Sequence, residues 1–199
     1  KIITTAEGGA CLTNNPELAN TLARLRSHGI TRNPAEMQGE PDGAWYYQQI
    51  DLGYNYRMTE LQAALGVSQM TRLDEFVARR HTLAARYDTL LADLPLTLPY
   101  RNPANQSALH LYPVQVQPES GKTRRQIFDY LRAHGIGVNV HYIPVHTQPY
   151  YRQRFGFKQG DFPAAEAYYA HAITLPLYFS LSEDEQDTVV ATLKQAFQA

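Results

Sequence analysis

The sequence predicts an α/β protein in which a long helical segment joins two domains. Three observations support this fold class. Short β-branched and glycine-containing runs open the chain, a helical pattern of about 35 residues follows, and strand and helix patterns alternate after residue 95. The predicted division is residues 1–58, residues 59–94 and residues 95–199.

The opening residues predict a strand, a tight turn and a second strand. Lys1 comes directly before the β-branched run at residues 2–5, and the glycine pair at residues 8–9 can form the turn. Residues 10–13 can then return as the second strand. This hairpin would hold the amine of Lys1 in a fixed place, which a catalytic amine requires. A solvated surface lysine is the alternative.

A helix and a long loop are predicted next. Asn15 is a typical N-cap and Pro16 suits the first helical position, while Gly29 can end the helix. Residues 31–55 are rich in proline, glycine and aromatic side chains. A loop of this length in a compact domain is usually functional, and its aromatic content argues against disorder.

The middle of the chain has the longest helical pattern. Thr59 and Gln62 have the spacing of a capping box, and apolar residues recur at steps of three and four from Leu61 to Leu94. The pattern fits two consecutive helices or one long connector, with Gly66 as a possible bend.

The remaining residues predict a small α/β domain. Pro113 should place the first of its strands at a sheet edge, because proline cannot donate to a ladder. The predicted order is a strand at 110–117, a helix at 123–134, a strand at 138–143, a helix at 164–172 and a final helix after the capping box at 182–185.

Composition excludes several classes of partner. A net charge of −1 gives no electrostatic basis for binding nucleic acid or an anionic membrane, and no apolar run approaches the ~20 residues of a bilayer span. The single cysteine, Cys11, cannot form an internal disulfide, which favours the cytoplasm. Because the sequence lacks an initiator Met, we expect it to begin within a longer protein.

Two further groups of residues are candidates for binding. Asn55 and Arg57 precede a predicted helix N-terminus, where an anion could bind, although a cap and a surface arginine would look the same. His141, Tyr142 and His146 follow a predicted strand. The cysteine and the other histidines lack the spacing of metal ligands, so no metal site is predicted.

Several segments together resemble the DegT-type sugar aminotransferases. They occur in the family's order and cover essentially the whole chain as the carboxyl half of such an enzyme. The segments are Lys1–Gly9, Arg26–Gly29, Gly53–Met58, Ala63–Leu65 with Gln69, and His141–His146.

This resemblance implies specific roles for the candidate residues. Lys1 matches the lysine that bonds covalently to pyridoxal 5'-phosphate and moves protons during transamination. Asn55 matches a residue that reaches the cofactor phosphate in the other subunit of a homodimer with shared active sites, and Arg57 is a helper. His141, Tyr142 and His146 match a segment near the nucleotide-sugar pocket.

The implied fold is the carboxyl half of a fold-type-I aminotransferase, consisting of the end of the large domain, a long connecting helix and a small α/β domain. The implied reaction transfers an amino group from an amino acid, with glutamate as the expected donor, to a nucleotide-linked 4-keto-6-deoxy sugar. In this family, other residues of the cofactor site precede the lysine. We therefore expect these 199 residues alone to be inactive and poorly folded.

Two alternatives stay open at this point. A sugar dehydratase of the same fold uses the same cofactor, but those relatives have a histidine at the position of Lys1. A non-catalytic assembly module could keep the fold without the chemistry. The residues upstream of Lys1 would separate this module from an enzyme.

Overall fold

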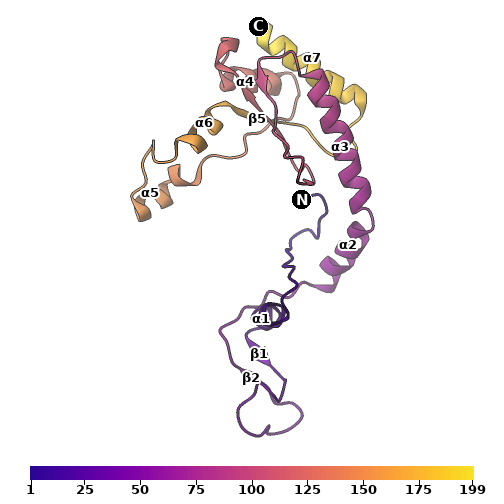
Figure 1. Cartoon of the computed structure of the whole chain (residues 1–199), viewed down its shortest axis with the longest axis vertical. Coiled ribbons are helices and arrows are strands. Elements are labelled where there is room, and N and C mark those ends of the chain that lie inside the picture. Colours follow the sequence, from indigo (N-terminus) through magenta and orange to yellow (C-terminus); the bar gives the residue numbers. More distant parts are fainter. The chain divides into compact units, whose positions relative to one another are not determined.

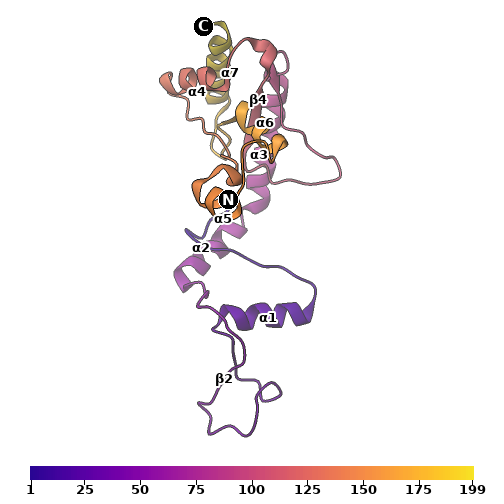
Figure 2. The same cartoon turned by 90° about the vertical axis from the view of Figure 1, so that its left-hand side faces the viewer.

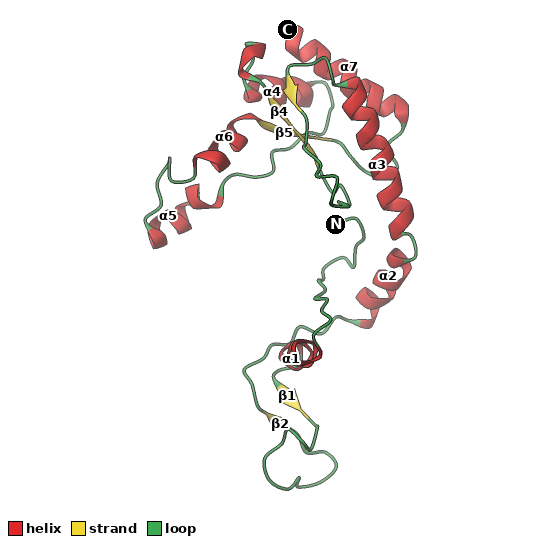
Figure 3. Ribbon diagram, in the orientation of Figure 1, coloured by secondary structure: helices red, strands yellow, loops and turns green.

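The structure of the protein is a computed structural model that describes residues 1–199. It consists of two units: residues 3–72 form one, and residues 73–199 together with Lys1 and Ile2 form the other. Figure 1 follows the chain through its elements and Figure 3 marks them as helix, strand or loop. Both element types alternate along the chain, which confirms the α/β class. The three-part division at residues 58 and 94 stays a prediction.

The unit of residues 73–199 contains a three-stranded antiparallel sheet with helices packed on it. The sheet order is β3-β4-β5, with Leu96 opposite Val116 and Tyr112 opposite Leu175. Its elements are α3 (Leu73–Leu90), β3 (Leu96–Thr97), β4 (Tyr112–Val116), η1 (Pro118–Ser120), α4 (Arg124–Ala133), η2 (Val145–Thr147), α5 (Pro149–Phe155), α6 (Pro163–His171), β5 (Ala172–Leu175) and α7 (Glu183–Gln198).

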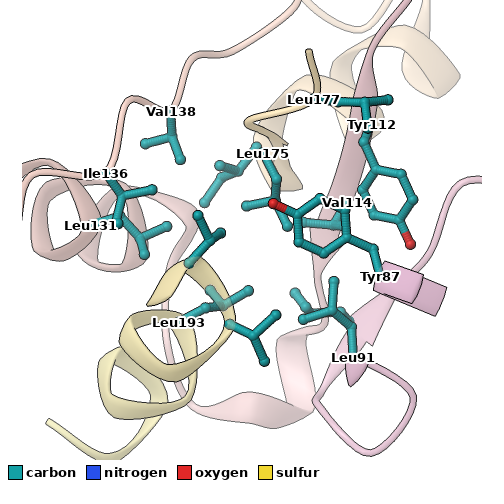
Figure 4. Close-up of a cluster of buried hydrophobic side chains, with 14 of the residues drawn as sticks. Tyr87, Leu91, Tyr112, Val114, Leu131, Ile136, Val138, Leu175, Leu177 and Leu193 are labelled. Atoms are coloured by element: carbon teal, nitrogen blue, oxygen red, sulfur yellow. The ribbon is translucent and has the colours of Figure 1, made fainter. Parts of the chain in front are cut away.

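The core of this unit lies between the sheet and helices α3, α4 and α7 (Figure 4). Alternate residues of β4 are buried, so one face of the strand enters the core. Leu131 of α4 and Leu193 of α7 are almost fully buried there, and each such side chain contributes about 1.5–3 kcal/mol. The hydroxyl of Tyr87 donates to the Pro176 carbonyl at 3.1 Å, which satisfies its polar end within the core.

Helix starts are well specified in this chain. The predicted capping boxes at Thr59 and at Ser182 are both present, with reciprocal bonds to Gln62 and Glu185. A third box, which the sequence reading missed, starts α4 at Thr123. Each box satisfies two backbone N–H groups that have no partner within the helix, so the start of the helix is fixed locally.

Two strand predictions for this unit are wrong in part. β4 is the central strand of the sheet and not an edge, because β3 pairs only with Gln115 and Val116 and leaves Pro113 with a neighbour on one side alone. The predicted strand at 138–143 is reduced to one bridge between Asn139 and Thr174. One edge of β5 is paired with β4 over its whole length, so residues 138–143 can pair only with the opposite edge of β5, and they do so at Asn139 alone.

The unit of residues 3–72 contains α1 (Pro16–Arg26), β1 (Ile30–Thr31), β2 (Gln48–Gln49) and α2 (Glu60–Met70). β1 and β2 pair antiparallel, and the loop between them extends beyond the pair (Figure 2). Asn15 caps α1 as predicted, since its side chain accepts from the N–H groups of Glu17 and Leu18. Neither α1 nor α2 has a buried residue.

The predicted opening hairpin is wrong. Residues 1–13 contain no strand, and the chain bends at residues 6 and 7 instead of at the glycine pair. Thr4 Oγ1 accepts from the N–H of Ala6 at 3.0 Å and Thr5 Oγ1 donates to the Glu7 carbonyl at 2.9 Å. Side-chain bonds of this kind offer the backbone an alternative to a strand ladder.

The long helical pattern forms two consecutive helices, α2 and α3, which is one of the two predicted forms. They separate at Thr71 and Arg72 and not at Gly66. Gly66 serves close packing instead: a Cβ there would lie 3.0 Å from Thr5 Cγ2. The apolar face does not begin where predicted, because Leu61 is 85% exposed.

Two glycines bring the residues after α1 against the chain before α2. Gly29 has a φ of +72°, and a Cβ on it would overlap the Asp51 carbonyl. A Cβ on Gly53 would overlap the backbone of His28 and Gly29. The N–H of Tyr54 donates to Leu25 O at 2.8 Å across this contact. Two facing glycines are therefore required for this approach.

Gly29→Ala should destabilise this contact strongly. Gly39 is a matched control, because it has the same φ of +72° but open space around its Cα. The left-handed conformation alone should cost Gly39→Ala about 1–2 kcal/mol, while Gly29→Ala should cost more because the new Cβ also displaces backbone. Denaturant unfolding of the two variants measures the difference. Equal losses would show that the backbone approach is not tight.

Candidate functional site

Lys1 is exposed and makes no hydrogen bond or ion pair in the structure. It belongs to the unit of residues 73–199, and its positive charges act on His110 of that unit. Burial and then the nearby charges of the Lys1 amines, Arg80 and His141 lower the pKa of His110. Lys1, His110 and His141 therefore share one electrostatic neighbourhood.

The residues after Lys1 lie against α2. Gln69 Oε1 accepts from the N–H of Thr4 at 3.3 Å, and Gln62 Nε2 donates to the Glu7 carbonyl at 3.1 Å. Gly8 has no room for a Cβ because Thr5 and Met58 fill the space. Two glutamines on one helix thus hold the opening segment without a strand partner.

Asn55 and Arg57 belong to the unit of residues 3–72, and both are exposed. Asn55 forms an antiparallel bridge with Ser27, which extends the backbone at this point. The flanking tyrosines, Tyr54 and Tyr56, stack with ring centroids 4.9 Å apart. Side chains alternate along extended backbone, so the tyrosines occupy one side and Asn55 with Arg57 the other. No hydrogen bond or ion pair occupies the side chains of Asn55 and Arg57, so both can bind an anion.

The structure brings His141, Tyr142 and His146 into one segment between Asn139 and α5, but in different environments. Tyr142 is 61% exposed and His146 only 7%. His141 Nδ1 lies 2.9 Å from the hydroxyl of Thr174 on β5. Tyr142 can therefore contact a ligand freely, whereas His146 is turned into the protein.

Glu166 of α6 is the partner of His146, and the sequence reading missed it. His146 Nε2 lies 2.8 Å from Glu166 Oε1, and since a carboxylate only accepts, the nitrogen carries the proton. The same oxygen accepts from the N–H of Gly160 at 2.7 Å. The bonds from His146 and Gly160 hold the pKa of the Glu166 carboxyl below its usual value. The pair is separated by 20 residues, which no local pattern reveals.

Two cavities border this segment. One, of about 570 Å³, has mixed polar and apolar walls that include Arg124, Glu166 and Tyr169, and the Arg124 guanidinium lies 4.6 Å from the centroid of the Tyr169 ring. The other, of about 430 Å³, is largely aromatic and includes His146 and Phe162. Pro144 lines both.

A buried arginine supports the neighbourhood of His110. Arg80 of α3 donates through Nη1 to the carbonyls of Leu109, His110 and Leu177 at 3.0–3.2 Å. Burial lowers the pKa of Arg80. This side chain fixes the loop before β4 to α3. The structure contains no group of three or more side chains suited to a metal ion, and no helix long and apolar enough to cross a membrane.

Comparison with known proteins gives a consistent result over the whole chain. The family model described as the DegT/DnrJ/EryC1/StrS aminotransferase family matches residues 1–194. Spore coat polysaccharide biosynthesis protein SpsC of Bacillus subtilis is 40% identical over 197 residues, which cover 98% of this chain and 50% of SpsC.

Two solved structures share the fold. Helicobacter pylori PseC, an aminotransferase involved in pseudaminic acid biosynthesis, superposes with a TM-score of 0.86 at 29% identity, over 100% of this chain and 51% of PseC. Streptococcus pneumoniae Spr1654 in its pyridoxamine-phosphate (PMP) form gives a TM-score of 0.86 at 32% identity, over 100% of this chain and 51% of its own. Spr1654 is also solved in its pyridoxal-phosphate (PLP) form. This chain spans about half the length of the relatives it matches.

Proposed function

Because this chain belongs to the DegT/DnrJ/EryC1/StrS aminotransferase family, we propose that it acts as the carboxyl half of a pyridoxal-phosphate-dependent sugar aminotransferase. The family match over residues 1–194 carries this proposal. The half-length coverage of SpsC, PseC and Spr1654 supports a longer enzyme of which these residues are a part. Lys1 also disfavours a dehydratase, whose relatives have histidine there.

The residues present fit pyridoxal phosphate. The Lys1 amine is exposed and free of hydrogen bonds, as a group that bonds to the cofactor must be. Asn55 and Arg57 offer donors without competing partners, which suits a phosphate dianion. We propose that these two side chains bind the cofactor phosphate of the neighbouring subunit in a homodimer. Such sharing would make each site depend on both chains.

Lys1 is proposed to move the proton. The bound cofactor supplies an electron sink next to the carbon that carries the amino group. Lys1 Nζ would take the proton from one carbon as general base and return it to another as general acid. The charges of Lys1 act on His110 together with those of Arg80 and His141, which supports a place for Lys1 among these side chains.

The proposed acceptor is a nucleotide-linked 4-keto-6-deoxy sugar, and glutamate is the proposed donor. PseC, whose described role is in pseudaminic acid biosynthesis, is the structural relative that favours such a sugar. His141 and Tyr142 are proposed to contact the nucleotide sugar, since an exposed tyrosine offers both a stacking face and a hydroxyl. His146 is proposed to act near the same pocket.

Borohydride reduction tests the proposal directly. The full-length protein is incubated with pyridoxal phosphate, reduced and digested, and its peptides are mapped by mass spectrometry. We expect a pyridoxyl adduct on Lys1, and glutamate should convert the cofactor to its amino form before reduction and so prevent that adduct. Adducts spread over Lys122, Lys158 and Lys194, with none on Lys1 in folded protein, would overturn the assignment.

A further inference from the structure

The segment of residues 141–147 is held at both ends and exposed between them. At one end, His141 lies 2.9 Å from Thr174 Oγ1, and at the other, His146 donates to Glu166 at 2.8 Å. Tyr142 and Ile143 between these anchors are 61% and 50% exposed. The anchors, and not packing of the exposed residues, therefore set the position of the segment.

Of the two anchors, Glu166 makes more contacts with the surrounding chain. A single carboxylate oxygen accepts from His146 and from the backbone of Gly160, whose φ of +96° favours glycine. It thereby joins three pieces of chain: η2, the loop before α6, and α6 itself. The His146 ring also packs on Phe162 with centroids 4.7 Å apart. Loss of the carboxylate would leave a buried imidazole N–H unpaired, which is costly.

We propose that Glu166 is a positioning residue: by holding His146 it sets the 141–147 segment so that His141 and Tyr142 face the sugar substrate. This inference rests on the proposed function. It assigns His146 to the support of the segment and leaves substrate contact to His141 and Tyr142. The 7% exposure of His146 is the reason.

The cavities show how the effect would reach the substrate. Glu166 lines the larger one together with Ile143 and Pro144, while His146 lines the smaller one with Pro144. Pro144 is thus a shared wall two residues from Tyr142. Without the hydrogen bond between His146 and Glu166, Pro144 and the nearby Tyr142 would no longer be held in position.

The test uses the full-length enzyme with bound cofactor and three variants. Glu166→Ala removes both hydrogen bonds, and Glu166→Gln keeps an oxygen that can accept them. Glu119→Ala is the control, because Glu119 is an exposed carboxylate of the same unit without a partner. The two half-reactions are measured separately, and hydrogen exchange is followed over residues 141–162.

We expect Glu166→Ala to raise KM for the nucleotide sugar about tenfold, with Glu166→Gln and Glu119→Ala close to the parent. The half-reaction with the amino donor should not change. Hydrogen exchange should accelerate at residues 144–148 and 158–162 in Glu166→Ala only.

Equal loss of both half-reactions would overturn the inference, since it indicates a general structural role. Unchanged exchange together with an unchanged KM would overturn it as well. Faster exchange without any change in sugar KM would also overturn it, and would leave the aminotransferase activity standing. A parent enzyme that turns over neither donor nor sugar would instead refute the proposed function, while the exchange data would still decide whether Glu166 anchors the segment.

Discussion

Lys1→Ala in the full-length enzyme is expected to lower kcat by roughly three orders of magnitude or more, because general acid–base transfer by one positioned group contributes about 10²–10⁴-fold. The loss should be this large because none of the other three lysines of this chain, Lys122, Lys158 and Lys194, precedes a comparable segment. The fold should be unaffected, since the Lys1 side chain makes no bond within the structure.

Steady-state transamination and thermal unfolding of the same preparation check this expectation. Lys194→Ala is the matched control, because Lys194 is exposed on α7 and has no partner. Small primary amines added to the Lys1→Ala enzyme should restore part of the rate, because they can supply the missing base. Turnover close to the parent in a folded Lys1→Ala enzyme would refute the role of Lys1.

Mixed dimers test whether the active sites are shared. Asn55→Asp places a negative charge where the cofactor phosphate is proposed to bind, so this variant should be nearly inactive, as should Lys1→Ala. When the two are unfolded and refolded together, half the dimers are mixed and each has one intact site, so about a quarter of the parental activity should return. Activity per mole of dimer is the measurement.

The control for this experiment is a mixture of Asn55→Asp with Arg57→Ala. Both changes affect the same contributed surface, so no mixed dimer has an intact site and no activity should return. If the mixture of Lys1→Ala with Asn55→Asp also stays inactive while mixed dimers are shown to form, each site is complete within one subunit and the proposed sharing is wrong.

The sequence predicted helices better than strands, and the reason is physical. The capping boxes at Thr59 and Ser182 act within four residues, so a local pattern reveals them. Strands need partners from elsewhere in the chain. The opening residues therefore looked like a hairpin but bond through Thr4 and Thr5, and residues 138–143 make only one bridge.

The candidate site shows the same difference between features that depend on neighbouring residues and features that depend on distant ones. The roles of Lys1, Asn55 and Tyr142 follow from the family resemblance of short sequence motifs, and they stay predictions. Glu166 could not be identified in this way, because a single glutamate among alanines in a predicted helix resembles any surface residue. The sequence also makes its partner His146 a candidate ligand contact, but the structure buries this side chain.

The two anchors of the 141–147 segment have a consequence for enzyme engineering. Because Thr174 and Glu166 fix its ends, the exposed residues between them behave as a replaceable cassette. Libraries at Tyr142 and Ile143 can therefore vary the contacts proposed for the sugar without disturbing the sheet or α6. Randomising the anchors together with them would mix altered selectivity with misplacement of the cassette.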